Sequence, residues 1–420
     1  MFLYVFAFPI ANVKYFDSAI VVFFFLFFLM IIDKRVRRQA KTIILSKSIL
    51  KVFFLWLLVI VYSVLIPIFL KTTDFSIIKT FIHQILSLIT GLLLIAYLNN
   101  KNVSIIDVIV YAFVAQAVIQ LLSFVFEPIK EVLNLFRSQS TIDIQMKYSG
   151  IRGLGVSGYA VFGLAVAYGL MFIMWAVEWK RTLTKVSIFL KMILISILLF
   201  GAMSAGRTAL VGFAIAVVIR VVMLIKENYV SLKSITGFVC FCFCAIFVLI
   251  VISRLGVSES VHNLFRYVNE FLANLINGKG FTSSSTDKLW DMYFKIDPNY
   301  LMFGCGKYTD VDGSYYMQTD AGYMRNILFF GVFGFMLLLV YQCAFLNFRG
   351  KKNTLKSLVY LLFLLLMHIK GEVVGFLIIT QSMLLLLNFS KYSEVQCESE
   401  SVVHNVEFQY KTGLFERVDW

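Results

Sequence analysis

The sequence predicts an all-α polytopic integral membrane protein with about twelve transmembrane helices and one large loop on the periplasmic side. Hydrophobic residues make up 60% of the 420 residues and charged residues only 15%, which is too little polar surface for a soluble chain of this length. The apolar runs are also longer than the alternating strands of about ten residues that form β-barrels. Helices are the remaining way to satisfy the backbone in lipid.

Apolar windows define the expected spans. They are residues 1–14, 18–32, 48–70, 77–98, 103–126, 154–176, 186–203, 207–225, 235–253, 321–347, 356–369 and 373–389. The first is short and equally compatible with a re-entrant segment. Nine helices are therefore expected in 1–253 and three in 321–389, followed by a polar cytoplasmic tail at 390–420.

The distribution of positive charge predicts the orientation. Four basic loops fall on the same side if the spans alternate, and these are 33–47, 180–185, 226–233 and 349–356. That side is expected to be cytoplasmic, with both termini inside. The net charge of +14 comes largely from such loops, so it does not indicate a nucleic-acid partner.

The orientation leaves two longer loops outside, a smaller one at 127–153 and a larger one at 254–320. A loop of roughly 65 residues on one side of the bilayer has little purpose in a simple transporter, because spans and short loops suffice there. An enzyme that acts on a large polar substrate at the membrane surface needs such a loop. The long loop therefore favours an enzyme.

Three spans that start on the outer side begin with small residues and an arginine, at 149–158, 204–208 and 320–325. Small residues let a ligand approach the backbone, a helix start offers unpaired N–H groups, and arginine adds a charged donor pair. Together these features predict a phosphate or diphosphate site. Close helix packing explains the glycines of 149–158 equally well. Arg207, at a tight turn between two spans, is either functional or reaches toward the interface.

The connection between the last two spans contains Lys370 and Glu372. Charges in so short a connection are costly unless they pair or face a polar cavity. A structural ion pair and a direct role in substrate binding both remain open. Walker A, dinucleotide-binding and serine-hydrolase motifs are absent, and the six cysteines show no metal-ligand spacing. We therefore expect neither a cofactor nor a metal.

These features resemble the bacterial O-antigen polymerases (Wzy type), within the superfamily that also contains the O-antigen ligases. Four stretches carry the resemblance: 204–210 (Ser-Ala-Gly-Arg-Thr-Ala-Leu), 290–306 with its Gly-Cys-Gly end, 319–334 with Thr-Asp-Ala-Gly-Tyr and Gly-Val-Phe-Gly, and 368–372 (His-Ile-Lys-Gly-Glu). The ligases carry His-Asn where this chain re-enters the membrane, and Asp320 stands at that histidine position. This departure favours a polymerase over a ligase.

The resemblance implies metal-independent, inverting glycosyl transfer at the periplasmic face of the inner membrane. The growing chain on undecaprenyl diphosphate is the donor, and one lipid-linked repeat unit is the acceptor. Candidates for binding the diphosphate are Arg152, Arg207, Arg254, Arg266 and Arg325. Asp320 is the candidate for orienting or deprotonating the acceptor hydroxyl, with Arg207 as the second catalytic residue. Lys370, Glu372 and Trp290 are expected to shape the site.

Two alternatives remain beside a polymerase of lipopolysaccharide biosynthesis. One is an O-antigen ligase, and the other is a lipid-linked oligosaccharide flippase, which is a transporter. A flippase is expected to have short, even loops and charges along a central cavity, whereas here the charges gather at one face. A chain-length regulator and a flippase are the protein partners that the resemblance suggests.

Overall fold

The computed structural model describes residues 1–10, 16–101, 103–137, 139, 142–143, 153–159, 161–226, 270, 274, 277–278 and 284–389. These residues form helices and connecting segments without any β-strand, and their two isolated β-bridges join Pro9 to Asp17 and Thr309 to Tyr315. The predicted all-α fold is confirmed.

Six described helices are long and apolar enough to cross a membrane. They are α4 (Lys47–Phe69), α5 (Ile78–Asn100), α6 (Ile105–Val125), α10 (Ile188–Ala205), α11 (Thr208–Lys226) and α16 (Gly322–Ala344). Three shorter apolar helices accompany them, namely α2 (Ser18–Ile32), α9 (Val161–Val177) and a final helix, Ile378–Phe389. Rows of phenylalanines on α2, such as Phe24 and Phe28, are exposed, as expected of side chains that face lipid. These features support a membrane-embedded protein.

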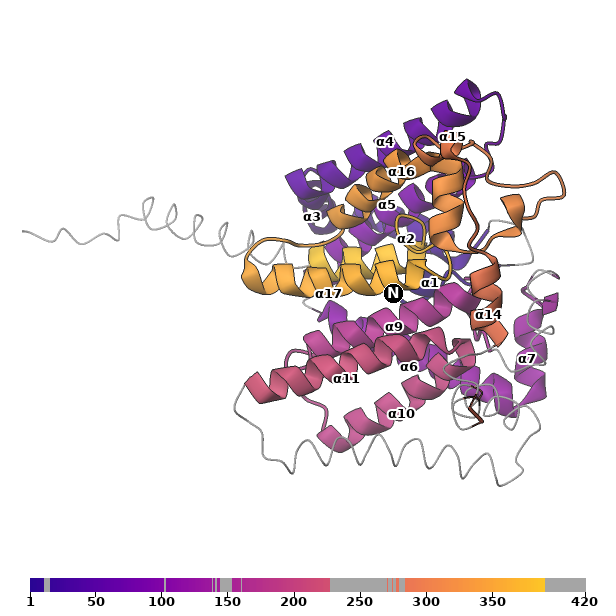
Figure 1. The fold of residues 1–420 in the computed structure, drawn as a ribbon. Helices are drawn as coiled ribbons and strands as arrows, with labels where there is room; N and C mark the ends of the chain where they lie inside the picture. The colour runs from indigo at the N-terminus through magenta and orange to yellow at the C-terminus, as the bar shows by residue number, and fades with distance from the viewer. Residues whose placement is uncertain are drawn as a thin grey trace, which may run out of the picture.

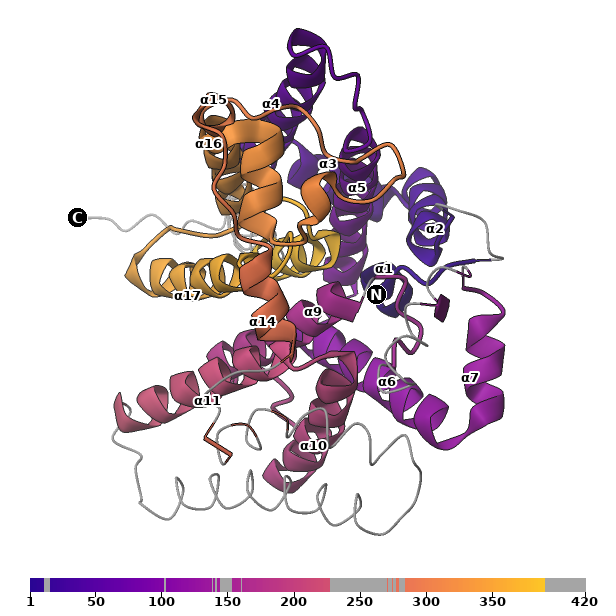
Figure 2. The same cartoon turned by 45° about the vertical axis from the view of Figure 1, so that its right-hand side comes forward.

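The helices form two groups on either side of α17 (Lys351–His368) (Figure 1). One group contains α4, α5 and the second half of α16, and the other contains α9, α10 and α11 (Figures 1 and 2). The apolar helix α9 is buried along nearly its whole length, because α6, α10, α11 and α17 all pack against it. The core of the bundle therefore lies along α9.

The remaining helices are short or amphipathic: α1 (Phe2–Phe6), α3 (Lys34–Ile44), α7 (Glu127–Asn134), α14 (Ser284–Asp291) and α15 (Pro298–Leu301). Helix α3 lies in the basic region that the sequence predicts as a cytoplasmic loop. It buries Val36, Ala40 and Ile43 at helical spacing and exposes most of its cations. Asp33 caps its first turn by accepting the backbone N–H of Arg35 at 2.8 Å.

Four expected spans differ from the observed elements. In the expected span 154–176, residues 154–159 are not helical, and α9 begins at Val161. In the expected span 1–14, α1 ends at Phe6, and residues 11–15 lie outside the described part of the chain. Helix α16 is broken at Gly331, whose φ of 69° and ψ of −179° are not helical, and its two halves run in different directions (Figure 1). In the last expected span, residues 373–377 are not α-helical, and the helix begins at Ile378. The expected span 235–253 and the tail 390–420 are outside the described residues.

Segments far apart in the sequence meet at one end of the bundle, which we call the site end. Thr72, between α4 and α5, donates its hydroxyl to the Gly306 carbonyl at 2.7 Å. Tyr293, after α14, donates its hydroxyl to the Ile369 carbonyl at 2.6 Å. The site end is therefore defined by segments 70–77, 292–321 and 369–373.

Candidate functional site

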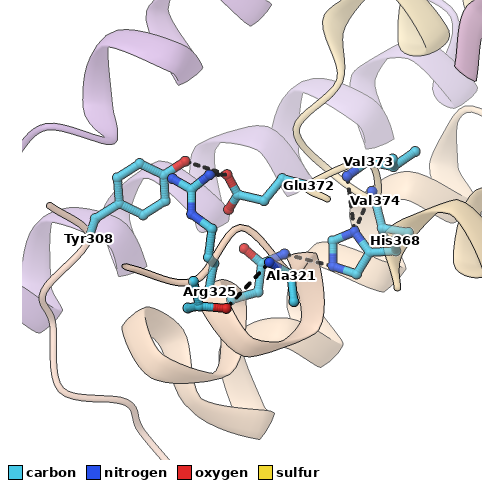
Figure 3. Close-up of polar contacts among 9 residues, drawn as sticks. Tyr308, Ala321, Arg325, His368, Glu372, Val373 and Val374 are labelled. Atoms are coloured by element: carbon cyan, nitrogen blue, oxygen red, sulfur yellow. Dashed lines mark hydrogen bonds and ion pairs between the residues drawn. The ribbon is translucent and has the colours of Figure 1, made fainter. Parts of the chain in front are cut away.

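The candidate site is built around the first turn of α16. Gly322 begins this helix directly against segment 368–371. A Cβ atom added to Gly322 would lie 2.4 Å from the Gly371 carbonyl oxygen and 2.5 Å from that of His368, so only glycine permits this approach. Arg325 follows one turn later and extends from α16 toward the same segment (Figure 3).

Arg325 and Glu372 form a buried ion pair. Nη1 of Arg325 lies 2.7 Å from Oε2 of Glu372, and the two side chains are 7% and 9% exposed. Tyr308 donates its hydroxyl to the same carboxylate oxygen at 2.5 Å (Figure 3). Burying two charges is costly even when they pair, and such pairs inside membrane proteins are concentrated at functional sites.

Two tyrosines of the 308–316 segment enclose the guanidinium group of Arg325. Its central carbon lies 4.3 Å from the centre of the Tyr308 ring and 3.6 Å from that of the Tyr315 ring. A tight turn holds these rings near each other, because Asp310 donates its N–H to the Ser314 carbonyl at 2.9 Å. Stacking on aromatic faces fixes the plane of an arginine, so its remaining N–H groups have a defined direction.

The ion pair retains unused hydrogen-bonding groups. Nε and Nη2 of Arg325 and Oε1 of Glu372 are buried and have no hydrogen-bond partner among the described residues. An unsatisfied buried polar group costs about 1–3 kcal/mol, and more if it is charged. Two N–H groups on one guanidinium edge match two oxygens of a carboxylate or phosphate. The pair therefore offers donors suited to an anionic ligand.

Asp320 lies next to this pair, at the point where the chain enters α16. Its side chain is exposed, yet partial withdrawal from water raises the pKa of its carboxyl, while the Arg325 guanidinium opposes that rise. Burial likewise raises the pKa of Glu372, against the effects of Arg325 and the Tyr308 hydroxyl. Two carboxyls thus share one cation, and Asp320 is the one that a substrate hydroxyl can reach.

His368 has a structural role in this geometry. Its Nδ1 accepts the backbone N–H groups of Val373 at 3.0 Å and Val374 at 3.1 Å (Figure 3), so Nδ1 carries no proton. The proton is then on Nε2, which lies 3.0 Å from the Asn326 side-chain amide. The amide nitrogen of Asn326 faces Nε2. A half-turn of this amide places its oxygen, which has no partner among the described residues, as the acceptor of that proton. His368 is fully buried and unsuited to act as a base.

Buried glutamines satisfy the non-helical backbone of 373–377. Gln342 accepts the N–H of Gly375 at 3.0 Å, and Gln84 donates to the Gly375 carbonyl at 2.7 Å. Irregular backbone at membrane depth is tolerated only where protein groups or water replace the missing helical bonds. These two glutamines therefore explain how the last helix begins as late as Ile378.

Asp74 fixes the 308–316 segment from the connection between α4 and α5, and sequence reasoning missed it. Its Oδ2 accepts the N–H groups of Tyr308 at 2.6 Å and Thr309 at 2.8 Å, while Oδ1 accepts the Ser76 N–H at 3.0 Å. Burial acts to raise the pKa of Asp74, but these hydrogen bonds together outweigh it and lower the pKa. The Asp-Phe-Ser sequence at 74–76 signals a local turn and gives no hint of the distant partner.

Arg207 lies in a second polar cluster at the turn between α10 and α11. Its Nη1 is 2.7 Å from Oε2 of Glu270, and its side chain is 11% exposed. Ser204, just before this turn, accepts the N–H of Gly153 at 3.2 Å through its carbonyl. The structure thus brings together two of the glycine-rich segments singled out in the sequence, 149–158 and 204–208, insofar as they are described.

The other predicted site residues have different surroundings. Lys370 is half-buried in the connection that carries Glu372. Trp290, on α14, is 68% exposed, and its ring centre lies 6.5 Å from that of Tyr293. Arg152, Arg254 and Arg266 lie outside the described residues. The described part of the site therefore contains Arg325, Glu372 and Asp320 from the predicted set.

Within the described ranges, no three His, Cys, Asp or Glu side chains gather closely enough to hold a metal ion. No protein-family model, curated protein or solved structure matches the chain. The function proposed below therefore depends on the site geometry and on the motifs of the sequence.

Proposed function

We propose that the chain is a bacterial O-antigen polymerase, a glycosyltransferase of the inner membrane that uses undecaprenyl-diphosphate-linked glycans as donor and acceptor. Its active site is the Arg325–Glu372 pair with Tyr308, Tyr315 and the neighbouring Asp320. The observation that carries this proposal is the assembly of a buried charge pair, an exposed carboxyl of raised pKa and two aromatic rings at one end of an apolar bundle.

In the proposed reaction, a hydroxyl of the acceptor sugar attacks the anomeric carbon of the donor. The bond to the diphosphate breaks, and its electron pair leaves with the diphosphate. Asp320 takes the proton of the attacking hydroxyl, and a raised pKa makes its carboxylate a better base. The unpaired Nε and Nη2 of Arg325, together with Arg207, neutralise the charge that develops on the leaving group.

The topology proposed for this enzyme has a cytoplasmic C-terminus, a periplasmic loop at 254–320 and eleven of the twelve expected spans. The first expected span is replaced by a re-entrant segment, because Leu3 and Phe8 both bond to Ser18 at the start of α2. Contacts at the two ends of the bundle support this topology. The connections at 70–77 and 369–373, both expected outside, meet the 292–321 segment. Glu178 and Lys356, both in or beside basic segments expected inside, form an ion pair with each other. Helix α3 fits the same topology. Asp17 caps the start of α2, which is expected outside, and the cations of α3 follow the opposite end of α2, which is expected inside.

The test is a complementation experiment in the host. The gene is deleted and restored as wild type, Asp320→Asn, Arg207→Ala or the control Asp287→Asn, which changes an exposed carboxyl on α14. Surface polysaccharide is then separated on a gel at equal membrane levels of each protein. Loss of a general base costs about 10²–10⁴ in rate, so we expect Asp320→Asn to reduce the ladder to core plus one repeat unit. The control keeps the full ladder.

The same gel separates the alternatives. A polymerase defect still allows one repeat unit to be exported and attached, whereas a ligase or flippase defect removes even that single unit. A full ladder with Asp320→Asn at normal protein levels would exclude Asp320 as the base. Loss of the single unit in the deletion strain would instead support ligation or flipping.

A further inference from the structure

A polar cavity lies apart from the Arg325–Glu372 pair. It has a volume of about 110 Å³ and lies among α1, the start of α2, the first turns of α5, segment 158–159 and Ile378. Figure 2 shows α1, α2 and α5 together on one side of the bundle. This volume suits several waters or one ligand the size of a small ring.

Three side chains from separate segments give the cavity its polar character: Asp17, His83 and Tyr159. Oδ1 of Asp17 caps α2 by accepting the N–H of Ala19 at 2.9 Å and that of Ile20 at 3.2 Å. No hydrogen bond engages Oδ2 of Asp17 within the described residues. That oxygen is therefore available to accept a hydrogen bond from a ligand.

The hydroxyls lining the cavity are already used by the protein. Ser87 lies 3.0 Å from the Ser382 hydroxyl and donates to the Tyr4 hydroxyl at 3.3 Å. Thr90 donates to the Leu86 carbonyl at 2.7 Å. Recognition of a ligand therefore depends chiefly on the Asp17 carboxylate and the Tyr159 phenol.

The cavity wall is fixed before any ligand binds. Ser18, next to Asp17, donates its hydroxyl to the Leu3 carbonyl at 2.6 Å and accepts the N–H of Phe8 at 2.8 Å. Gly158, next to Tyr159, donates its N–H to the Phe6 carbonyl at 2.9 Å. These bonds tie the N-terminal residues to both polar walls, and such preorganisation favours specific binding.

The chemistry of the lining selects among ligand classes. The Asp17 carboxylate disfavours phosphate and other anions, and a lipid tail would bury its free oxygen without a hydrogen-bond donor. A carboxylate acceptor, and a phenol that donates, accepts and offers a flat ring, suit a neutral ring with several hydroxyls. We propose that this cavity binds one sugar ring.

This inference rests on the proposed function in one respect, the choice of a glycan as substrate. The geometry links the cavity to the active site through α5. His83 lines the cavity, while the adjacent Gln84 donates to the carbonyl of Gly375, three residues after Glu372. The cavity is therefore a sugar subsite, separated by α5 from the place where the glycosidic bond forms.

The test measures sugar binding directly. Full-length protein is purified in detergent, and saturation-transfer NMR is recorded with each monosaccharide released by acid hydrolysis of the host's own surface polysaccharide. We expect at least one monosaccharide to bind wild type. Asp17→Asn removes a charged acceptor and should weaken the affinity for this monosaccharide about tenfold or more. Tyr159→Phe removes a neutral hydrogen bond and should weaken the affinity several-fold. Asparagine still caps α2, and unchanged unfolding midpoints confirm folding.

Asp320→Asn serves as the matched control, because it alters the active site and leaves the cavity intact. We expect it to bind the monosaccharide as wild type does. The cavity proposal is overturned if no monosaccharide binds wild type, or if Asp17→Asn binds as well as wild type. Binding lost in Asp17→Asn would support the sugar subsite even if Asp320→Asn kept a full polysaccharide ladder, an outcome that would contradict only the proposed polymerase mechanism.

Discussion

Arg325 and Arg207 have similar places in the sequence and different environments in the structure. Each stands within a few residues after a glycine at the start of an apolar helix, and each pairs with a glutamate at 2.7 Å. Glu372, the partner of Arg325, is 9% exposed, whereas Glu270, the partner of Arg207, is 29% exposed. The same combination of glycine and arginine thus leads to a buried pair, Arg325–Glu372, which we call the locked pair, and to a more accessible pair, Arg207–Glu270.

The local sequence therefore places an arginine at the start of a helix, and segments distant in the sequence determine how buried its ion pair is. Two tyrosines from the 308–316 segment cover Arg325, and Asp74 from another connection holds that segment in place. Arg207 has its glutamate 63 residues away in the sequence. The more accessible pair is the better suited to exchange its glutamate for a diphosphate, and the locked pair is the better suited to orient a reacting group.

The largest expected effect tests this contrast through stability. Glu372→Gln leaves a buried guanidinium without its counter-charge, which should cost about 3–5 kcal/mol of unfolding free energy. Glu270→Gln removes a more exposed partner and should cost about 1 kcal/mol or less. The measurement is the thermal unfolding midpoint of each variant in the same detergent.

Equal shifts of the midpoint in these two variants would contradict the contrast, because both glutamates would then contribute equally to the stability of the fold. A larger shift for Glu270→Gln would reverse it. A double variant with Arg325→Met and Glu372→Gln provides a control. Removing both charges should recover part of the lost stability, since apolar replacements of buried pairs are often neutral.

The sequence predicted the fold class well, because long apolar runs have few ways to satisfy their backbone in lipid. Helices α4, α5 and α10 begin or end within two residues of the predicted spans. The break at Gly331 was not predicted. A Cβ there would lie 2.2 Å from the Met302 carbonyl oxygen, a contact with a segment almost thirty residues earlier that periodicity cannot reveal.

The candidate site was predicted in part. Lys370 and Glu372 were identified by the cost of charge in a short connection, but the sequence did not predict that Arg325 is the partner of Glu372. Tyr308, Tyr315 and Asp74 were missed as site residues, because aromatic and acidic residues are common in outer loops and only the folded chain shows what they contact. The sequence also gave no reason to expect His368 to accept two backbone N–H groups.

The second prediction concerns Asp74, which holds the 308–316 segment whose tyrosines cover Arg325. In Asp74→Asn only one side-chain oxygen remains, so it cannot accept both from Ser76 and from the amides of Tyr308 and Thr309. Hydrogen bonds to a charged acceptor are worth about 1.5–3 kcal/mol. Exchange of the Tyr308 and Thr309 amides should therefore become about ten- to a hundredfold faster by hydrogen-exchange mass spectrometry.

Asp312→Asn is the matched control. Asp312 makes the same turn with Ser314 that Asp74 makes with Ser76, but it is exposed and contacts no distant segment among the described residues. Its substitution should leave those two amides protected. If both variants loosen the segment equally, the connection between α4 and α5 does not lock the site.

The lowered pKa of Asp74 adds a pH dependence to this prediction. A carboxyl whose folded pKa lies below its unfolded value stabilises the fold above the unfolded pKa, which is about 3.9. The stability difference between wild type and Asp74→Asn should thus be full near neutral pH. It should shrink as pH falls below about 4 and vanish once Asp74 is protonated in the folded state. A difference that grows on acidification would contradict this role.

The smallest expected effect concerns the ring over the exposed side of the locked pair. Tyr315→Leu keeps apolar bulk and removes the aromatic face that lies 3.6 Å from the Arg325 guanidinium, a contact worth about 0.5–2 kcal/mol. Tyr300→Leu, which changes an exposed tyrosine of α15 with no described cation over its ring, should change the unfolding midpoint less. Because the ring also orients the guanidinium, we expect Tyr315→Leu to shorten the polysaccharide ladder at normal protein levels. A shifted midpoint with an unchanged ladder would show that the ring stabilises Arg325 without orienting it for the reaction, and Arg207 would then be the arginine that contacts the diphosphate.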